Sequence, residues 1–170
     1  CTVYGQADEL PITEQAHIKE PESPYGNTKK VGEKIIKDTC FAEKSLNTIS
    51  LRYFNPIGAH KSAKIGELPI GTPQNLVPFV TQTGIGLREK LFIFGNDYPT
   101  PDGTCIRDYI HVVDLAKAHV IAITRLLEKK NIDNYEVYNI GTGKGSSVLD
   151  VVNAFEEVSG EKLNYSFANR

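Results

Sequence analysis

The sequence predicts an α/β fold, namely the final part of a doubly wound parallel sheet followed by a smaller mixed α/β region. Two observations support this prediction. A helical pattern over residues 25–43 leads into an apolar strand at 48–54, and a second helical pattern at 114–130 is followed by a strand at 137–140. Helices that lead into apolar strands are typical of parallel sheets, whose connections are helical. No linker composition marks a domain boundary between the two parts.

The first part of the chain is expected to place one long helix before one strand. Residues 2–4 have the composition of a strand tip closed by Gly5, and the polar residues 6–22 are expected to be a loop. Ser23 is a good N-cap, and Pro24 suits the first helical position because its missing N–H would have no partner there. Spacings of three and four residues predict one buried stripe on this helix: Thr28, Val31, Ile35, Ile36, Thr39 and Cys40.

The second part alternates short elements with loops rich in Gly and Pro. In order, we expect a loop at 55–73, a helix at about 75–87, a strand at 91–94, a loop at 95–106, an extended piece at 109–111 and a turn at 141–145. The helix over 114–130 is expected to bury one side: Leu115, Ala118, His119, Ala122, Ile123 and Leu126. Ser147 and Asp150 form a capping box for a last helix, which Gly160 ends. No closing element is expected before Arg170, so we expect the sequence to be a piece of a longer chain.

Composition argues against several classes of protein. Of the 170 residues, 40% are hydrophobic and 24% charged, and the net charge is −2, so neither a nucleic-acid surface nor an anionic-membrane surface is expected. The apolar runs are too short to span a bilayer, and no signal peptide is visible. Cys1, Cys40 and Cys105 are widely spaced, which is typical neither of a metal cluster nor of a disulfide framework, and indicates a reducing, cytoplasmic setting.

Tyr25 and Lys29 are the first candidates for chemistry. Residues four apart on a helix share one face, so the ammonium of Lys29 can approach the phenol of Tyr25. A free phenol is a poor base at neutral pH, but a nearby cation favours its ionised form, which can accept a proton from a hydroxyl as hydride leaves the same carbon. The spacing alone is weak, because such pairs also occur by chance as exposed helical neighbours.

Several longer motifs narrow the interpretation. They are SPYGNTK at 23–29, RYFNPIGAH at 52–60, PQNLVP at 73–78, FGNDY at 94–98 and GTCIRDYIHVVDLA at 103–116. With these motifs the sequence resembles the extended short-chain dehydrogenase/reductase family, and within it the UDP-galactose 4-epimerases (UDP-glucose 4-epimerases), over essentially its whole length. The resemblance implies a Rossmann-like sheet, NAD as cofactor, a UDP-sugar as substrate and a homodimer when full length. It also implies that residues 1–56 end the NAD-binding domain and that 57–170 mainly bind the UDP-sugar, with returns to the sheet.

The same resemblance implies roles for the matching residues. Tyr25 is the catalytic acid/base, Lys29 binds the nicotinamide ribose and tunes Tyr25, and Tyr53 lies near the nicotinamide. The implied substrate-binding residues are Thr2, Asn55, Gln74, Asn75, Leu76, Phe92, Ile93, Phe94 and Arg107. Two of these assignments have a direct physical reason, since the helix N-terminus at Asn75 and the guanidinium of Arg107 both suit a diphosphate.

Other interpretations stay open at some of these positions. Arg107 can instead form an ion pair with Asp108 or Asp114, and Phe92 and Phe94 can simply be core residues of their strand. Structural or loop positions are expected for His60, His111, His119 and the turn at 141–145, which lacks the spacing of a phosphate-binding loop.

The implied reaction interconverts UDP-galactose and UDP-glucose by oxidation at C4, rotation of the 4-keto sugar and reduction on its other face. One alternative is a 4,6-dehydratase, although residues 1–5 lack the acidic pair that dehydratases carry there. Another is a non-catalytic sugar-nucleotide-binding regulator of the same fold. The family's catalytic Ser or Thr would precede Cys1, and its Gly-rich dinucleotide turn and Arg-x-Gly-Asp run lie outside residues 1–170. The chain alone is therefore not expected to bind NAD or to turn over.

Overall fold

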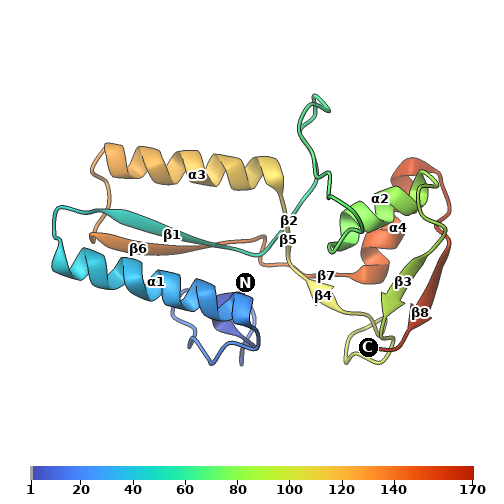
Figure 1. Ribbon diagram of the computed structural model, residues 1–170, viewed down its shortest axis with the longest axis horizontal. Coiled ribbons are helices and arrows are strands. Elements are labelled where there is room, and N and C mark those ends of the chain that lie inside the picture. The colour runs from blue at the N-terminus through green and yellow to red at the C-terminus, as the bar shows by residue number, and fades with distance from the viewer. Residues whose placement is uncertain (1) are drawn as a thin grey trace. The chain divides into compact units, whose positions relative to one another are not determined.

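The computed structural model describes residues 2–170, which divide into two units (Figure 1). The first unit extends to Pro56 and resumes at Ile110–Lys144, and the second comprises Ile57–Tyr109 and Gly145–Arg170. Cys1 lies outside the described residues. The predicted α/β class is confirmed, because helices alternate with strands and the longer strand pairs are parallel.

The first unit is built on two parallel strands, β1 (Thr48–Tyr53) and β6 (Tyr135–Ile140). Their register sets Thr48 opposite Tyr135 and Tyr53 opposite Ile140. The helices α1 (Pro24–Ala42) and α3 (Val112–Leu127) both contact β1, and the strand pair runs between them (Figure 1). The predicted helix-to-strand succession is thus present twice in this unit.

The start of α1 follows the sequence prediction. The hydroxyl of Ser23 accepts a hydrogen bond from the backbone N of Gly26 at 3.1 Å, and Pro24 is the first helical residue. Ser23 therefore satisfies one of the N–H groups that a helix start leaves without a partner. This cap fixes where the helix begins.

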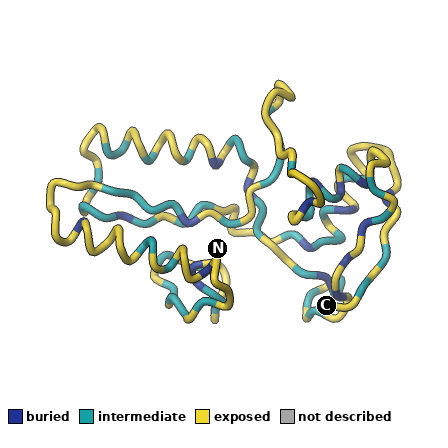
Figure 2. The backbone as a smooth tube through the Cα atoms, in the orientation of Figure 1, coloured by how far each residue is buried: buried dark blue, intermediate teal, exposed yellow. Residues whose placement is uncertain are grey.

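The buried stripe predicted for α1 is wrong. Val31 is 46% exposed and Ile35 is 59% exposed, and Thr28, Ile36 and Thr39 are exposed as well. Of the predicted stripe, only Cys40 is buried. Gly26, which does not belong to the stripe, is the other buried residue of α1. A polar contact explains why another side of α1 is the less exposed one. Glu33 lies on that side and pairs with the buried Arg52 of β1. Figure 2 shows how much of α1 is exposed.

Residues Thr2–Tyr4 form a short 3₁₀ helix, η1, and not the expected strand tip. Val3 and Tyr4 are buried, and the Tyr4 hydroxyl donates to Oδ1 of Asn139 at 2.6 Å. For a β-prone run of only three residues, such tertiary contacts determine the conformation and outweigh the intrinsic preference for a strand.

The helix α3 starts slightly before its expected position. Nδ1 of His111 accepts a hydrogen bond from the backbone N of Val113 at 3.1 Å and acts as the N-cap. On the side expected to be buried, Leu115 is buried, and Ala118, Ala122 and Leu126 are half-buried. His119 and Ile123 are exposed, contrary to the prediction.

The second unit packs the helices α2 (Leu76–Gly84) and α4 (Val148–Ser159) with the parallel strands β3 (Leu91–Phe94) and β8 (Tyr165–Ala168). Its core cluster contains Val80, Leu91, Ile93, Val152 and Leu163. The strand β8 contradicts the expectation that no closing element precedes Arg170. The four residues of β8 are too few to predict a strand from the sequence when no turn signal accompanies them. The strand forms because it pairs with β3.

Two further strand pairs are short. β4 (Ile106–Arg107) pairs antiparallel with β7 (Ser146–Ser147), and β2 (Asn55–Ile57) pairs with β5 (Tyr109–His111). The loop expected at 55–73 therefore begins with a strand. At α4 the predicted capping box of Ser147 and Asp150 is confirmed, as is the C-cap at Gly160, whose φ of 75° is the left-handed conformation that glycine allows.

Residues 2–170 lack two features. No helix among them is both long and apolar enough to cross a membrane. No group of His, Cys, Asp or Glu side chains in this range has the arrangement of a metal site. Within the same range Cys40 and Cys105 are free thiols.

Candidate active site

Tyr25 and Lys29 lie next to each other at the start of α1. The ammonium Nζ of Lys29 is 5.1 Å from the centroid of the Tyr25 ring. Tyr25 is 60% exposed, so its hydroxyl is accessible to a ligand. None of the ion pairs between residues 2–170 includes Lys29. The sequence pattern has therefore produced an accessible phenol with an available cation beside it.

The C-terminal end of β1 carries the next two predicted residues. Tyr53 is 44% exposed, and its ring centroid is 6.2 Å from that of His119 at an interplanar angle of 51°. Asn55 follows in β2 and is exposed, as is Thr2 in η1. Ligands of parallel α/β sheets bind beyond the carboxyl ends of strands, which is where Tyr53 and Asn55 lie.

A buried polar network that sequence reasoning missed fixes α1 to this strand. Arg52 forms two parallel hydrogen bonds with the Glu33 carboxylate, Nε to Oε1 at 2.7 Å and Nη2 to Oε2 at 2.6 Å. Its Nη1 donates to the Tyr4 hydroxyl at 2.7 Å, and Tyr4 donates to Asn139 of β6. The hydrogen bonds with Glu33 raise the pKa of Arg52 although burial opposes them. Four segments of the first unit are joined in this way.

Two signals in the sequence could have revealed this network. Arg52 is the single charged residue of its strand, and charged residues are seldom fully buried unless they are paired. Glu33 follows Lys29 by one helical turn and is the acidic residue of α1 that faces the strand. Neither signal identifies the partner, because the two residues come from different elements.

In the second unit, the predicted residues at the start of α2 differ in their accessibility. Gln74 and Asn75 are exposed, whereas Leu76 is half-buried against the core cluster. Asn75 is the N-cap by position, but its side chain makes no capping bond and donates to Oε1 of Glu67 at 2.8 Å. The backbone N–H groups of this helix start are thus free of a side-chain cap.

The strand β3 alternates strictly between buried and exposed residues. Ile93 is 2% exposed and belongs to the core, while Phe92 is 50% exposed and Phe94 is 64% exposed. The core interpretation of the two phenylalanines is therefore wrong. Because Ile93 as a whole residue is buried in the core, it offers a ligand almost no surface.

Arg107 is exposed on β4. Its Nη1 donates to the backbone O of Ile106 at 2.9 Å, and none of the ion pairs found among residues 2–170 includes it. The alternative partner Asp114 pairs with Lys117 instead, at 3.0 Å. The guanidinium therefore keeps most of its donors for a ligand.

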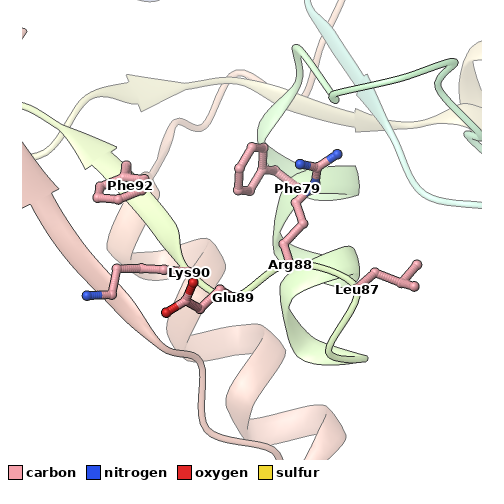
Figure 3. A pocket seen from close by; sticks show the side chains of 6 residues that line it. All are labelled: Phe79, Leu87, Arg88, Glu89, Lys90 and Phe92. Atoms are coloured by element: carbon pink, nitrogen blue, oxygen red, sulfur yellow. The ribbon is translucent and has the colours of Figure 1, made fainter.

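An open depression of about 490 Å³ lies beside β3 (Figure 3). It is lined by Phe79, Leu87, Arg88, Glu89, Lys90 and Phe92. The guanidinium carbon of Arg88 is 4.8 Å from the centroid of the Phe79 ring, and its Nε donates to Gln82 at 2.7 Å. The exposed Phe92 thus borders a depression lined by aromatic, aliphatic, cationic and acidic side chains.

Comparison with known protein families gives a single assignment for most of the chain. Residues 1–141 match the NAD dependent epimerase/dehydratase family. The chain belongs to this family. The matched range includes every residue proposed above for the site, from Thr2 to Arg107.

Among the relatives of this epimerase/dehydratase family member are several UDP-glucose 4-epimerases. The protein of that name from Drosophila melanogaster is 50% identical over 172 residues, which cover 100% of this chain and 48% of the relative. The one from Bacillus subtilis is 51% identical over 170 residues, covering 100% and 49%. The chain therefore spans about half the length of the curated relatives it matches.

Solved structures give the same result for this family member. The UDP-glucose 4-epimerase of Bifidobacterium longum in complex with NAD⁺ and UDP matches with a TM-score of 0.92 and 46% identity, covering 99% of this chain and 49% of the other. The enzyme of Stenotrophomonas maltophila, with bound NAD and formylated UDP-arabinopyranose, matches with a TM-score of 0.93 at the same identity and coverage.

Proposed function

We propose that this chain is part of an NAD-dependent UDP-glucose 4-epimerase that interconverts UDP-galactose and UDP-glucose, with Tyr25 as its acid/base. The observation that carries the proposal is the Tyr25–Lys29 pair, an accessible phenol with an ammonium 5.1 Å from its ring centroid. The named relatives at about half identity support the choice of reaction.

The residues of the first unit fit NAD. Lys29 has no acidic partner among residues 2–170, so its ammonium can donate to ribose hydroxyls, and the exposed rings of Tyr25 and Tyr53 can border the nicotinamide. When bound, NAD would accept a hydride from C4 of the sugar and return it.

Tyr25 would handle the proton in both directions. Its phenolate accepts the proton of the 4-hydroxyl during oxidation, and its phenol returns a proton to O4 during reduction. Because the same atom accepts and returns the proton, this chain needs no second acid/base group for the two directions.

The second unit would hold the UDP. The start of α2 at Gln74–Leu76 and the guanidinium of Arg107 suit the diphosphate, and the segment Phe92–Phe94 suits the uridine through its two exposed phenylalanines. Asn55 and Thr2 would contact the phosphate and sugar region. Firm binding of the nucleotide leaves the oxidised sugar free to rotate without leaving the protein.

The same proposal divides the chain by role. Residues 1–56 would end the NAD-binding domain, and 57–170 would mainly bind the UDP-sugar and return in part to the sheet. The full-length protein would be a cytoplasmic homodimer. Free Cys40 and Cys105 support a reducing compartment, and the exposed apolar side of α1 supports an interface there.

The test is an epimerase assay on the full-length protein and its Tyr25→Phe variant, with UDP-galactose as substrate and UDP-glucose as the detected product. We expect kcat to fall roughly 10²- to 10⁴-fold, because the proton acceptor is lost. UDP affinity, measured by calorimetry, should stay unchanged.

A Tyr165→Phe variant is the matched control, since Tyr165 belongs to β8 and has no role in the proposed site. Absence of epimerase turnover in the folded, NAD-loaded wild type would overturn the proposal and favour a dehydratase or a non-catalytic regulator. Full activity of Tyr25→Phe would overturn the role of Tyr25 alone.

A further inference from the structure

A partly buried polar clamp, formed by Asp102, Thr104 and Ser147, holds the loop that precedes Arg107. Oδ1 of Asp102 accepts hydrogen bonds from the backbone N and from Oγ1 of Thr104, both at 2.8 Å. Its Oδ2 accepts a hydrogen bond from the hydroxyl of Ser147 at the start of α4. Thr104 is fully buried and Ser147 is 4% exposed. One carboxylate thus joins two segments that are distant in the sequence.

The contacts continue from this clamp toward Arg107. The backbone O of Cys105 accepts a hydrogen bond from the N of Val148 at 3.1 Å. In the strand pair β4–β7, Ile106 lies opposite Ser147 and Arg107 opposite Ser146. The segment 102–107 is therefore attached stepwise to the start of α4, and Arg107 is its last attached residue.

The turn within the clamp tolerates little change. Gly103 has a φ of 75°, and a Cβ at this position would lie 2.4 Å from the backbone O of Asn96. Only glycine fits there. The hydrogen bond from Ser147 is also the main reason why the pKa of Asp102 lies below its usual range, so this carboxylate stays ionised as an acceptor.

We infer that Asp102 and Ser147 are positioning residues that hold Arg107 where its guanidinium can bind the diphosphate of the nucleotide. The inference rests on the proposed function, in which Arg107 is the diphosphate ligand. A strand of two residues has too few ladder hydrogen bonds to fix a side chain by itself, and ligands are held precisely only when neighbouring hydrogen bonds support them. The clamp supplies that support from the core side.

The test uses the full-length, NAD-loaded protein and measures the Kd of UDP by calorimetry together with kcat and KM. Asp102→Asn replaces one acceptor oxygen with a donor, so we expect the Kd and KM to rise roughly tenfold, as for the loss of a charge-assisted hydrogen bond. The value of kcat should change much less, because Tyr25 is not involved.

A double-mutant cycle separates positioning from general damage. Arg107→Ala alone should weaken UDP binding, and adding Asp102→Asn in that background should change the Kd by less than about twofold, because the residue through which it acts is gone. An Asp102→Asn effect of equal size in both backgrounds would overturn the inference. Unchanged UDP affinity in Arg107→Ala would instead overturn the proposed role of Arg107 itself.

A second pair of variants covers the case in which Asp102→Asn does not fold. Ser147→Ala removes the hydroxyl donor, so it should weaken UDP binding. Ser147→Thr keeps the donor, so it should bind UDP like the wild type. Ser159→Ala, at the other end of α4, is the matched control and should leave the Kd unchanged. Equal UDP affinity of all three variants would contradict the inference.

Discussion

Among single residues, Arg52 has the most demanding environment. It is 7% exposed and carries a full charge, which is costly to remove from water unless a partner of opposite charge replaces the lost hydration. Glu33 provides that partner with two parallel hydrogen bonds, and the Arg52 guanidinium also lies 4.8 Å from the centroid of the Tyr4 ring. The position of α1, and with it Tyr25 and Lys29, depends on this pair.

Glu33→Gln should therefore destabilise the protein strongly. The substitution leaves the buried Arg52 charge uncompensated, and we expect a loss of about 3–5 kcal/mol in the free energy of unfolding. Urea unfolding of the full-length protein measures it. Asp38→Asn breaks the exposed Lys34–Asp38 pair on the same helix and should leave the urea midpoint unchanged. Equal midpoints for the two variants would contradict this account.

At the scale of elements, the connection from α3 to β6 depends on one acidic residue. Glu136 is 8% exposed, accepts hydrogen bonds from Arg125 of α3 at 2.8 and 3.0 Å, and accepts one from the backbone N of Ile132 at 2.7 Å. The hydrogen bonds from Arg125 lower the pKa of Glu136 to about 2 from its usual 4.5, and the bond from Ile132 adds to this. The ionised carboxylate thus fastens the helix to the strand.

This connection predicts a pH dependence of stability. A carboxylate with a lowered pKa stabilises the fold above its unfolded pKa, so the contribution should be complete above pH 4.5 and disappear as the pH falls toward about 2. Urea midpoints of wild type and Glu136→Gln should differ at pH 7 and converge at acidic pH. The exposed Glu157→Gln should match the wild type throughout. A difference that does not vary with pH would count against the explanation.

The elements also indicate which predictions can be made from sequence. Caps are local, and Ser23, Ser147 and Gly160 were predicted correctly because each acts within a few residues of its own position. The short elements η1 and β8 were not, since their conformations are set by distant partners, Asn139 for Tyr4 and β3 for β8. The face of α1 was misassigned because its burial depends on a charge pair and not on apolar periodicity.

At the scale of the whole molecule, the accessibility of the candidate residues agrees with their proposed roles, and the roles themselves stay predictions. The types and spacing of Tyr25, Lys29 and Arg107 indicated their chemistry, and all three are accessible as that chemistry requires. The clamp at Asp102 and the network at Arg52 were not predicted, because each joins residues that only the folded chain brings together.

The exposed apolar side of α1 leads to a prediction about assembly. Val31 and Ile35 lie one turn apart and are 46% and 59% exposed, so in the proposed homodimer we expect them to be covered by the second copy. Replacing both by Glu should convert the full-length protein from dimer to monomer in size-exclusion chromatography with light scattering.

Lys37→Glu is the matched control on this helix, because it changes the charge of an exposed position that is not apolar. It should remain a dimer. A double Glu variant that stays dimeric would show that the interface lies elsewhere.

The pairing of β3 with β8 has a consequence for synthesis. Leu91 pairs with Tyr165, so β3 leaves the ribosome long before its partner strand has been made. At a translation rate of roughly 5–20 residues per second, the edge of β3 stays unpaired and the apolar side of α2 stays exposed for several seconds. Nascent chains in this interval expose the surface to which chaperones bind and through which unfinished chains aggregate. The yield of folded protein should therefore depend on the rate at which residues 95–165 are translated.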